Sequence, residues 1–393
     1  MSATRRPVTD TRKELPAGWR WVNLKEIGIF EAGGTPAKER KDYWNGEIPF
    51  VTGADITELF ITKNNARAFL TRNGLYSGKT VICEAGTVII VTRTRVGRSG
   101  IAQEVMGASQ DITAFKCGPE IHQEFLCRYL HNISEHLIDN CRGATIQGLT
   151  REFVDTLEIP LPSIAEQKRI AGLLREQMAA VDKACAAAQA RLEAAKALPA
   201  AFVHDTLQNG QRRKHRLGDC LVEERNGVGA DWANYPILGA TRNGLAPAKE
   251  AVGKSPERYK LVNPVTVFYN PMRILLGSIA MVDEEDATGI TSPDYVVVKG
   301  KRGVLDTRWF YYWFRSVQGT QLINALSRGA VRERILFNRL ASGMIELPDY
   351  ETQLRASTRM RHVMPIVENV IQELETINAL PAALLRRAFQ GEL

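Results

Sequence analysis

The chain has 393 residues, of which 44% are hydrophobic, so it exceeds what one hydrophobic core usually supports, and we expect two or three domains. Its formal net charge of +7 favours an anionic partner, with nucleic acid as the first candidate, although a generic basic protein has the same balance. The polar first 14 residues exclude a secretory signal, no apolar run reaches membrane-spanning length, and the cysteines form no CxxC pair, so we expect a cytoplasmic protein without disulfides.

The first part of the chain, residues 1–162, is predicted to be a head that mixes strands and helices. Short β-branched runs such as 87–92 lie between Gly, Asn and Asp residues, which indicates strands separated by turns. The apolar residues of 124–138 have helical spacing. Gly33-Gly34-Thr35-Pro36 is typical of a tight turn or of a backbone cradle for a phosphate, and we favour the turn.

A long helix is predicted next, within a first spacer at 163–210. Ser163 and Glu166 have the spacing of a capping box, and prolines just upstream block an earlier start. The alanine-rich sequence indicates that this helix extends to about Leu198. Its seam residues are small, which favours close approach of a partner helix.

A second head, residues 211–348, is also predicted to mix strands and helices. The runs 265–269 and 295–298 predict strands, and 309–326 predicts a helix. Its aromatic run, 309–314, is interpreted as core packing, with stacking on extruded bases as the alternative.

The second spacer, residues 349–393, opens with Asp349 as a helix cap, and its apolar positions then step by four and three, which is coiled-coil spacing. Pro365 interrupts this pattern, because an interior proline removes a backbone hydrogen bond and clashes with the preceding turn, so we predict a kink or break near Val363 to Pro365. The residues predicted for helix pairing or subunit docking are Gln167, Ile170, Leu174, Val181, Gln353, Met360, Val363, Val367, Val370, Leu374 and Ile377.

The chain contains a long internal repeat. Residues 142–169 match 328–355 without a gap, and 197–201 and 379–383 both read Ala-Leu-Pro-Ala-Ala. A repeat of this length indicates a duplicated unit, made of a head followed by a helix. Because the first helix leads into the second head and the second helix leads out of it, we expect antiparallel helices with a head at each end. The predicted fold class is therefore α+β, with two mixed heads, two long antiparallel coiled-coil helices and pseudo-two-fold symmetry.

Several motifs together carry a family resemblance. They are Leu15-Pro16-x-Gly18-Trp19-x-Trp21-Val22-x-Leu24, Gly33-Gly34-Thr35-Pro36, Tyr43-Trp44-x-Gly46-x-Ile48-Pro49-Phe50, the LPxxxxQ helix starts and the LPAA helix ends. Combined with the repeat, they resemble the DNA specificity subunit of type I restriction-modification systems over nearly the whole chain. The second head departs from the pattern, because Asn226-Gly227-Val228-Gly229 replaces the Gly-Gly-Thr-Pro segment, and the second helix has Thr352 where the first has Glu166.

The resemblance implies two target recognition domains that alternate with two spacer helices. It implies a non-catalytic subunit that selects an asymmetric, bipartite sequence in double-stranded DNA and carries two adenine methyltransferase subunits. S-adenosylmethionine is then expected in those partners and no cofactor in this chain. Whether restriction and translocation subunits join them stays open, as do the recognised sequence and the length of its spacer.

Reading DNA requires side chains that reach base edges and basic groups that meet phosphates. The candidate residues are Thr35, Lys38, Arg40, Lys41, Tyr43, Trp44, Arg93, Arg95, Arg98, Arg142 and Gln147 in the first head and Arg242, Asn243, Arg273, Arg328, Arg332 and Arg334 in the second. For each of them, a solvated surface charge or ordinary packing is the alternative. Arg142 and Arg328 recur in otherwise unlike heads, which favours a structural or phosphate-binding role.

Two enzymatic hypotheses are alternatives to DNA recognition. A self-sufficient adenine methyltransferase needs an Asn/Asp-Pro-Pro-aromatic tetrapeptide, but Tyr269-Asn270-Pro271-Met272 lacks the second proline and the aromatic, so we interpret it as a turn. A nuclease needs clustered carboxylates, and the acid expected two residues before Lys299 is Val297. An enzyme with an unrecognised active site stays as the alternative, and a coiled-coil protein without sequence preference is a third.

A metal site is also not expected. Cys127 and His131 lie four residues apart, but no pair of cysteines has zinc-finger spacing. We therefore predict no catalytic residues and no metal ligands.

Overall fold

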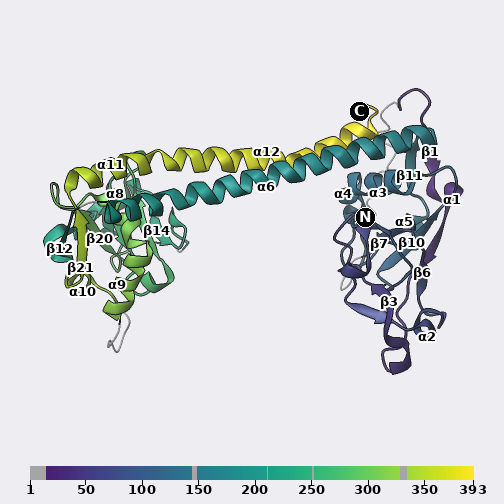
Figure 1. Ribbon diagram of the computed structural model, residues 1–393, viewed down its shortest axis with the longest axis horizontal. Coiled ribbons are helices and arrows are strands. Elements are labelled where there is room, and N and C mark those ends of the chain that lie inside the picture. Colours follow the sequence, from purple (N-terminus) through teal and green to yellow (C-terminus); the bar gives the residue numbers. More distant parts are fainter. Residues whose placement is uncertain (1–14, 144–147, 210, 250–251, 328–333) are drawn as a thin grey trace. The chain divides into compact units, whose positions relative to one another are not determined.

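The computed structural model describes residues 15–143, 148–209, 211–249, 252–327 and 334–393 (Figure 1). Contacts divide the chain into two compact units, Met1–Ala186 with Glu375–Leu393, and Ala187–Leu374. Each unit contains one head and parts of both long helices. Among the described residues, no helix combines the length and the hydrophobicity needed to cross a lipid bilayer.

The first head is built on a five-stranded sheet with the order β2-β10-β7-β8-β4. Its strands are β2 (Gly28–Ala32), β4 (Phe60–Ile61), β7 (Val88–Val91), β8 (Ser99–Ala102) and β10 (Ile112–Cys117), and β7 confirms the strand predicted at 87–92. Neighbouring strands are antiparallel except β4 and β8. Helix α3 (Gln123–Asn132) packs Phe125, Leu126 and Leu130 against Val88 and Ile90 of this sheet.

A second sheet and several short elements complete the first head. The sheet has the order β5-β3-β9-β6, formed by β3 (Trp44–Val51), β5 (Ala68–Leu70), β6 (Val81–Cys83) and β9 (Met106–Ala108). A ribbon of β1 (Arg20–Asn23) and β11 (Glu158–Leu161) joins the start of the head to its end. The short helices are α1 (Leu24–Ile27), α2 (Arg72–Leu75), α4 (Ser134–Asp139) and α5 (Arg151–Val154). Because α3 and α4 are separated at Ile133, the single helix predicted at 124–138 is two helices.

Gly33 and Gly34 serve a purpose that the sequence did not reveal. Both residues follow β2 and neither lies in a turn, so the predicted tight turn is wrong. A Cβ atom on Gly33 would lie 2.0 Å from the carbonyl oxygen of Ser109, and one on Gly34 would lie 2.1 Å from that of Lys79. Their N–H groups donate to Ile112 and Ala108, so these amides are not available for a phosphate. The glycines are required because backbones approach closely here.

The second head repeats the topology of the first. Its main sheet, β13-β20-β17-β18, has the same order of equivalent strands as β2-β10-β7-β8. The strands are β13 (Leu221–Glu223), β17 (Thr266–Tyr269), β18 (Ile279–Val282) and β20 (Val296–Gly300), which confirms the strands predicted at 265–269 and 295–298. The ribbon of β12 (Arg212–Arg216) and β21 (Met344–Pro348) corresponds to that of β1 and β11. The duplication seen in the spacers therefore extends into the cores of the heads.

The remaining elements of the second head are short. Two-stranded sheets are formed by β14 (Leu238–Thr241) with β15 (Gly244–Pro247), and by β16 (Lys260–Val262) with β19 (Gly289–Thr291). The helices are α7 (Leu217–Cys220), α8 (Thr307–Phe314), α9 (Val317–Ser327) and α10 (Phe337–Ala341). The helix predicted at 309–326 is thus divided between α8 and α9. Trp309, Phe310 and Phe314 are fully buried, which confirms the aromatic run as core.

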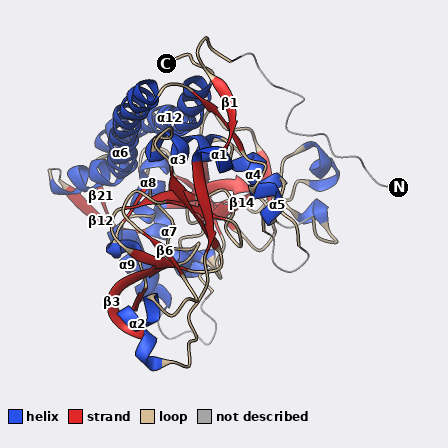
Figure 2. Cartoon of the chain, turned by 90° about the vertical axis from the view of Figure 1, so that its right-hand side faces the viewer, coloured by secondary structure: helices blue, strands red, loops and turns tan. Residues whose placement is uncertain are grey.

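Helix α6 (Ile164–Gln208) contributes to both units (Figures 1 and 2). It continues through Pro199, so the predicted end near Leu198 is wrong. Val203 and Leu207 lie beyond the proline and are buried in the core of the second head, and this burial offsets the lost hydrogen bond. The capping box is only half formed: Ser163 accepts from the Glu166 N–H, but the Glu166 carboxylate binds Arg169.

The second spacer consists of α11 (Tyr350–Arg361) and α12 (Val363–Phe389). Asp349 caps α11 by accepting from the Thr352 N–H at 2.9 Å, as predicted. The break at His362 confirms the interruption expected near Pro365. Pro365 lies in the first turn of α12, where its missing N–H has no intrahelical partner to lose.

The long helices are antiparallel within each unit, as predicted. In the first unit, Arg169 donates to the Leu393 carbonyl and the Cys185 thiol contacts Asn378, so the positions advance in opposite directions. In the second unit, Arg191 and Glu373 form an ion pair at 3.1 Å. Helix pairing there buries three valines of α12 against two small or branched residues of α6, namely Val363, Val367 and Val370 against Leu192 and Ala195.

One buried carboxamide joins each head to the start of its spacer helix. The Gln167 oxygen accepts from the His122 N–H at 2.8 Å, and its nitrogen donates to the carbonyls of Glu120 and Pro162, both at 2.9 Å. Gln167 is fully buried, as is Gln353, the equivalent residue of the second spacer. Glutamine suits this position because one carboxamide supplies an acceptor oxygen and two N–H donors, which match the three backbone groups.

The second unit repeats this arrangement with Gln353. Its oxygen accepts from the Asp306 N–H at 2.9 Å, and its nitrogen donates to Val304 at 3.1 Å and Pro348 at 2.9 Å. His122 and Asp306 are the N-cap residues of the equivalent helices α3 and α8. The glutamine of each LPxxxxQ motif therefore fixes a spacer helix to the same helix of its head.

We expect Gln167→Leu to destabilise the first unit by about 3 kcal/mol or more, because it leaves three buried backbone groups without a partner. Gln189→Leu, on the exposed surface of α6, serves as the control and is expected to change stability by less than about 0.5 kcal/mol. Denaturant unfolding of the full chain measures both, and an unchanged midpoint for Gln167→Leu would show that the carboxamide is dispensable.

Val370→Asp is expected to cost about 3 kcal/mol, because it places a carboxylate in the apolar contact between the helices. The neighbouring Ile371 is 40% exposed, so Ile371→Asp adds the same charge on the outside of the pair and is the matched control. Thermal unfolding of both variants compares them, and equal losses would contradict the observed helix pairing.

Candidate nucleic-acid interface

One edge of the main sheet gathers loops from distant parts of the first head. Because β7 and β10 are antiparallel, the end of β7 lies beside the start of β10, and β2 also ends there. The chain leaves this edge through Thr35 after β2 and through the loop 92–98 between β7 and β8. The topology therefore brings together candidates that are far apart in sequence.

At this edge, Arg93 and Arg142 lie on either side of the chain at Gly148. Gly148 forms isolated β-bridges with both residues, and the Leu149 N–H donates to the Thr92 carbonyl at 2.8 Å. The side chains of Arg93, Arg95 and Arg142 are exposed, whereas Arg98 is half-buried and donates to the Ile56 carbonyl. Gln147 lies outside the described residues.

Thr35 belongs to the same edge. Its hydroxyl donates to the side-chain oxygen of Gln110, in the turn between β9 and β10. The neighbouring Asp111 carbonyl accepts from the N–H groups of Thr92 and Arg93. Contacts thus lead from Thr35 through this turn to the arginine loop. Gln110 is a polar residue of this edge that no sequence motif singles out.

The candidates at 38–44 lie elsewhere, around the start of β3 and α2, which Figure 1 shows at the end of the first unit farthest from α6. Arg40 makes a two-point hydrogen bond with Asp42, which raises the pKa of the guanidinium, and it stacks 4.7 Å from the centre of the Tyr43 ring. Trp44 donates to the Ala37 carbonyl and packs edge-on against Phe50. Lys38 and Lys41 are the exposed cations of this group for which the described residues show no side-chain hydrogen bond or ion pair.

The second head presents an edge of the same kind. The loop 270–278, between β17 and β18, corresponds to 92–98 and carries Arg273. The Ile335 N–H donates to the Pro271 carbonyl at 3.0 Å, in the way that Leu149 donates to Thr92, and this contact places Arg334 beside the loop. Arg328 and Arg332 lie outside the described residues.

Arg242 and Asn243 form the turn between β14 and β15 and are exposed. Arg315 holds this turn against the start of β18, because its guanidinium donates to the carbonyls of Arg242 at 2.7 Å and Ile279 at 2.6 Å. Three predicted arginines from separate segments therefore meet at the edge. Arg315, the C-cap residue of α8, was not selected from the sequence, and it fixes the turn that carries Arg242.

The predicted docking residues divide into four groups. Gln167 and Gln353 are buried at the junctions of heads and helices, so they lie away from any docking surface. Ile170 and Leu174 belong to the core of the first head, and Met360 to that of the second. The helix contact itself contains Val363, Val367, Val370 and Leu374, while Val181 and Ile377 are half-buried.

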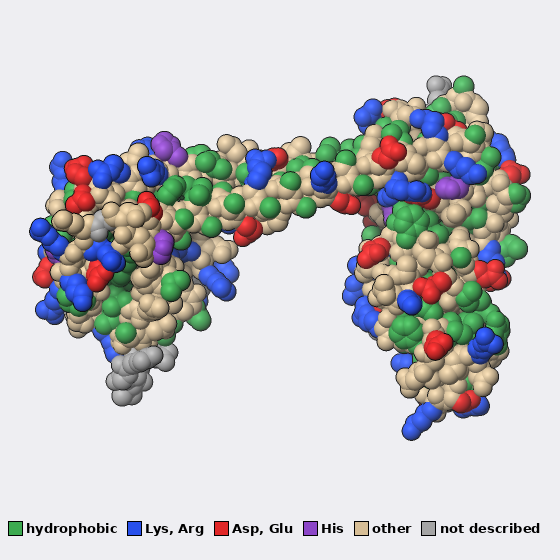
Figure 3. All heavy atoms as spheres, in the orientation of Figure 1, with side chains coloured by type: hydrophobic (Ala, Val, Ile, Leu, Met, Phe, Trp, Pro, Cys, Tyr) green, Lys and Arg blue, Asp and Glu red, His purple; other side chains and the backbone are tan. Residues whose placement is uncertain are grey.

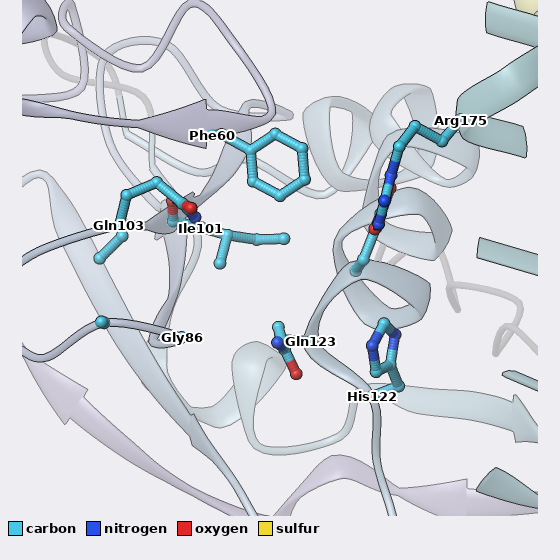
Figure 4. Close-up of a pocket in the computed structure, with 10 residues that line it drawn as sticks. Phe60, Gly86, Ile101, Gln103, His122, Gln123 and Arg175 are labelled. Carbon is cyan, nitrogen blue, oxygen red and sulfur yellow. The ribbon is translucent and has the colours of Figure 1, made fainter. Parts of the chain in front are cut away.

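An arginine at equivalent positions of the spacers also binds each head. Arg175 pairs with the buried Glu124 of α3, and Arg361 pairs with Glu284 at 2.5 Å and Glu285 at 2.6 Å. Figure 4 shows Arg175 reaching from α6 towards the start of α3, opposite the Phe60 ring. The hollow between them is about 190 Å³, and its charged groups are already used in holding the head to the helix.

The segments weighed as enzyme sites have structural roles. Asn270 accepts from the Met272 N–H, so Tyr269-Asn270-Pro271-Met272 is a turn, and Tyr269 is fully buried. Cys127 and His131 both bind Ser99. Burial raises the pKa of the Cys127 thiol to about 12 and lowers that of His131. In the described part of the chain, no three His, Cys, Asp or Glu side chains form a group able to hold a metal ion.

Charge alone does not mark the interface. On the face drawn in Figure 3, Lys and Arg side chains are distributed over both heads, with acidic side chains among them. The equivalent loops of the two sheets therefore indicate a candidate binding site for an anionic ligand more specifically than the distribution of charge does.

Comparisons with known proteins agree with this arrangement. The family described as "Type I restriction modification DNA specificity domain" matches residues 16–183. The MjaIX specificity subunit of Methanocaldococcus jannaschii is 29% identical over 170 residues, 42% of this chain and 39% of that protein, so the chain spans about two fifths of this relative. The StySPI specificity subunit of Salmonella potsdam is 25% identical over 433 residues, 97% of this chain and 90% of that protein.

A solved structure concerned with complex assembly and conformational transition of the type I R-M system has the same fold. One of its chains gives a TM-score of 0.66 at 18% identity and covers 97% of this chain and 100% of that chain. The family model covers the first head and the start of α6, and the second head has the same order of equivalent main-sheet strands as the first. The chain is therefore similar to the specificity subunits of type I restriction-modification systems.

Proposed function

We propose that this chain is the DNA-recognition subunit of a type I restriction-modification complex, in which each head reads one part of a bipartite target in double-stranded DNA. The observation that carries the proposal is the pair of equivalent sheet edges, each of which collects arginines from separate loops. Arginine fits this role because it binds guanine edges and phosphates with two parallel hydrogen bonds. Since the loops differ between the heads, the two half-sites differ and the target is asymmetric.

The chain itself supplies recognition and scaffolding, and methyl transfer comes from partner subunits that bind S-adenosylmethionine. The partners are two copies of an adenine methyltransferase, to which restriction and translocation subunits add where the system cleaves DNA. The duplicated spacers support two equivalent docking positions, one for each methyltransferase copy. The outer surface of the spacers has exposed apolar side chains. On α12 these are Met364, Ile366, Ile371 and Leu380.

Mapping methylated adenines in a genome with and without this gene tests the function. Deletion is expected to remove methylation from one motif made of two separated parts, and the purified chain is expected to transfer no methyl group from S-adenosylmethionine by itself. An unchanged methylation pattern would contradict the proposal. Methyl transfer by the isolated chain would instead favour an enzyme with its own active site.

Arg142→Ala is expected to weaken binding of all duplexes alike and to reduce the slope of log affinity against log salt concentration by about 1, the effect of losing one phosphate contact. Lys183→Ala removes one exposed charge from α6 and is the control, with an unchanged slope. Fluorescence anisotropy at several salt concentrations measures both. A loss confined to one sequence would assign Arg142 to base reading instead.

A further inference from the structure

The loop between β17 and β18 exposes apolar side chains in a fixed conformation. Met272 is 53% exposed, Leu275 36% and Leu276 71%. Ile274 is buried in the core of the head and anchors the loop, and Gly277, at φ +82°, ends its short 3₁₀ turn. The outward direction of the two leucines is therefore set by the fold.

Positive charge surrounds this apolar loop. The exposed side chains of Arg242, Arg273 and Arg334 come from three segments that lie together, and Gly277 is close to Arg242. These segments, 240–244, 270–278 and 334–338, contain no Asp or Glu. Leu336, 49% exposed, extends the apolar surface from the third segment. In these three segments, the exposed charged side chains that the structure describes are arginines, and an apolar surface with such neighbours suits a polyanion that also offers nonpolar groups.

The equivalent loop of the first head has a different chemistry. It reads Thr92-Arg93-Thr94-Arg95-Val96-Gly97-Arg98, and its one large apolar side chain, Val96, is half-buried. The same position in the fold thus carries arginines in one head and exposed leucine and methionine in the other. Both loops lie at the equivalent edge of their sheets. The two heads would therefore contact a ligand at the same place in the fold but with different side-chain chemistry.

We propose that the second head reads its half-site through nonpolar contacts, in which Met272, Leu275 and Leu276 pack against the nonpolar surface of bases in duplex DNA. Two such surfaces exist, the thymine methyl group in the major groove and the face of a base exposed when a base step opens. The flanking arginines hold the loop on the phosphates. This inference rests on the proposed function, and it assigns polar reading to the first head.

The test uses the full chain and a duplex that it selects from a randomised pool. Thymines of the selected sequence are replaced one at a time by uracil, which removes the methyl group, and bases are replaced by 2-aminopurine, which fluoresces when unstacked. With the wild-type chain, contact with a thymine methyl group predicts weaker binding when that thymine is replaced by uracil. Contact with an unstacked base predicts that the fluorescence of 2-aminopurine at that position rises on binding. Either response is expected in one half-site only. The double variant Met272→Ser with Leu276→Ser is expected to bind about tenfold more weakly and to lose that response.

Val222→Ser is the matched control, because Val222 is 46% exposed and pairs with Lys299 near the other end of the same sheet. It is expected to bind and respond like the wild type. Wild-type affinity and an unchanged response in the double variant would overturn the inference. So would a double variant that binds DNA normally but fails to assemble with the methyltransferase subunit, since the loop would then be a protein-docking surface. If the wild-type chain selects no duplex, the proposed function itself fails.

Discussion

The buried carboxamides of Gln167 and Gln353 are the constraint on which the arrangement of each unit depends. Each ties the first turn of a spacer helix to the cap of a head helix, by three hydrogen bonds to backbone. Because the bonds involve backbone groups, they are insensitive to the side chains of the heads. The heads are therefore free to differ in sequence while each keeps the same orientation on its own helix. Arg175 and Arg361 reinforce this with ion pairs whose acidic partners come from different elements in the two units.

This separation of scaffold from reading surface agrees with where the heads differ. The main sheet, the closing ribbon and the helix that follows the sheet are common to both. The first head then adds a four-stranded sheet, where the second has two pairs of short strands. The architectural differences thus lie outside the common sheet, ribbon and helix, so under the proposed function the contacts with DNA can differ without disturbing the core.

The repeat, the helix starts, the aromatic core and the break before Pro365 could be predicted because each depends on local sequence or on matching segments. Other features depend on tertiary contacts. Pro199 did not end its helix, because burial of Val203 and Leu207 outweighs the local preference. Gly33 and Gly34 gave the composition of a turn, but the reason for them is the approach of Ser109 and Lys79. The pairing of both Arg93 and Arg142 with Gly148, and the role of Arg315, required the strand order.

The last turn of α12 has a consequence for how the protein is made. Leu385, Ala388 and Phe389 complete the core of the first head, where Phe389 lies 5.1 Å from Phe125 and 5.2 Å from Tyr129, ring centre to ring centre. A ribosome produces these residues long after the rest of that head. In the second head, by contrast, the helix residues that complete the core, Val203 and Leu207, are synthesised before the head itself. The part translated first is therefore the part finished last, and until then it exposes an aromatic cavity to the cell and to its chaperones.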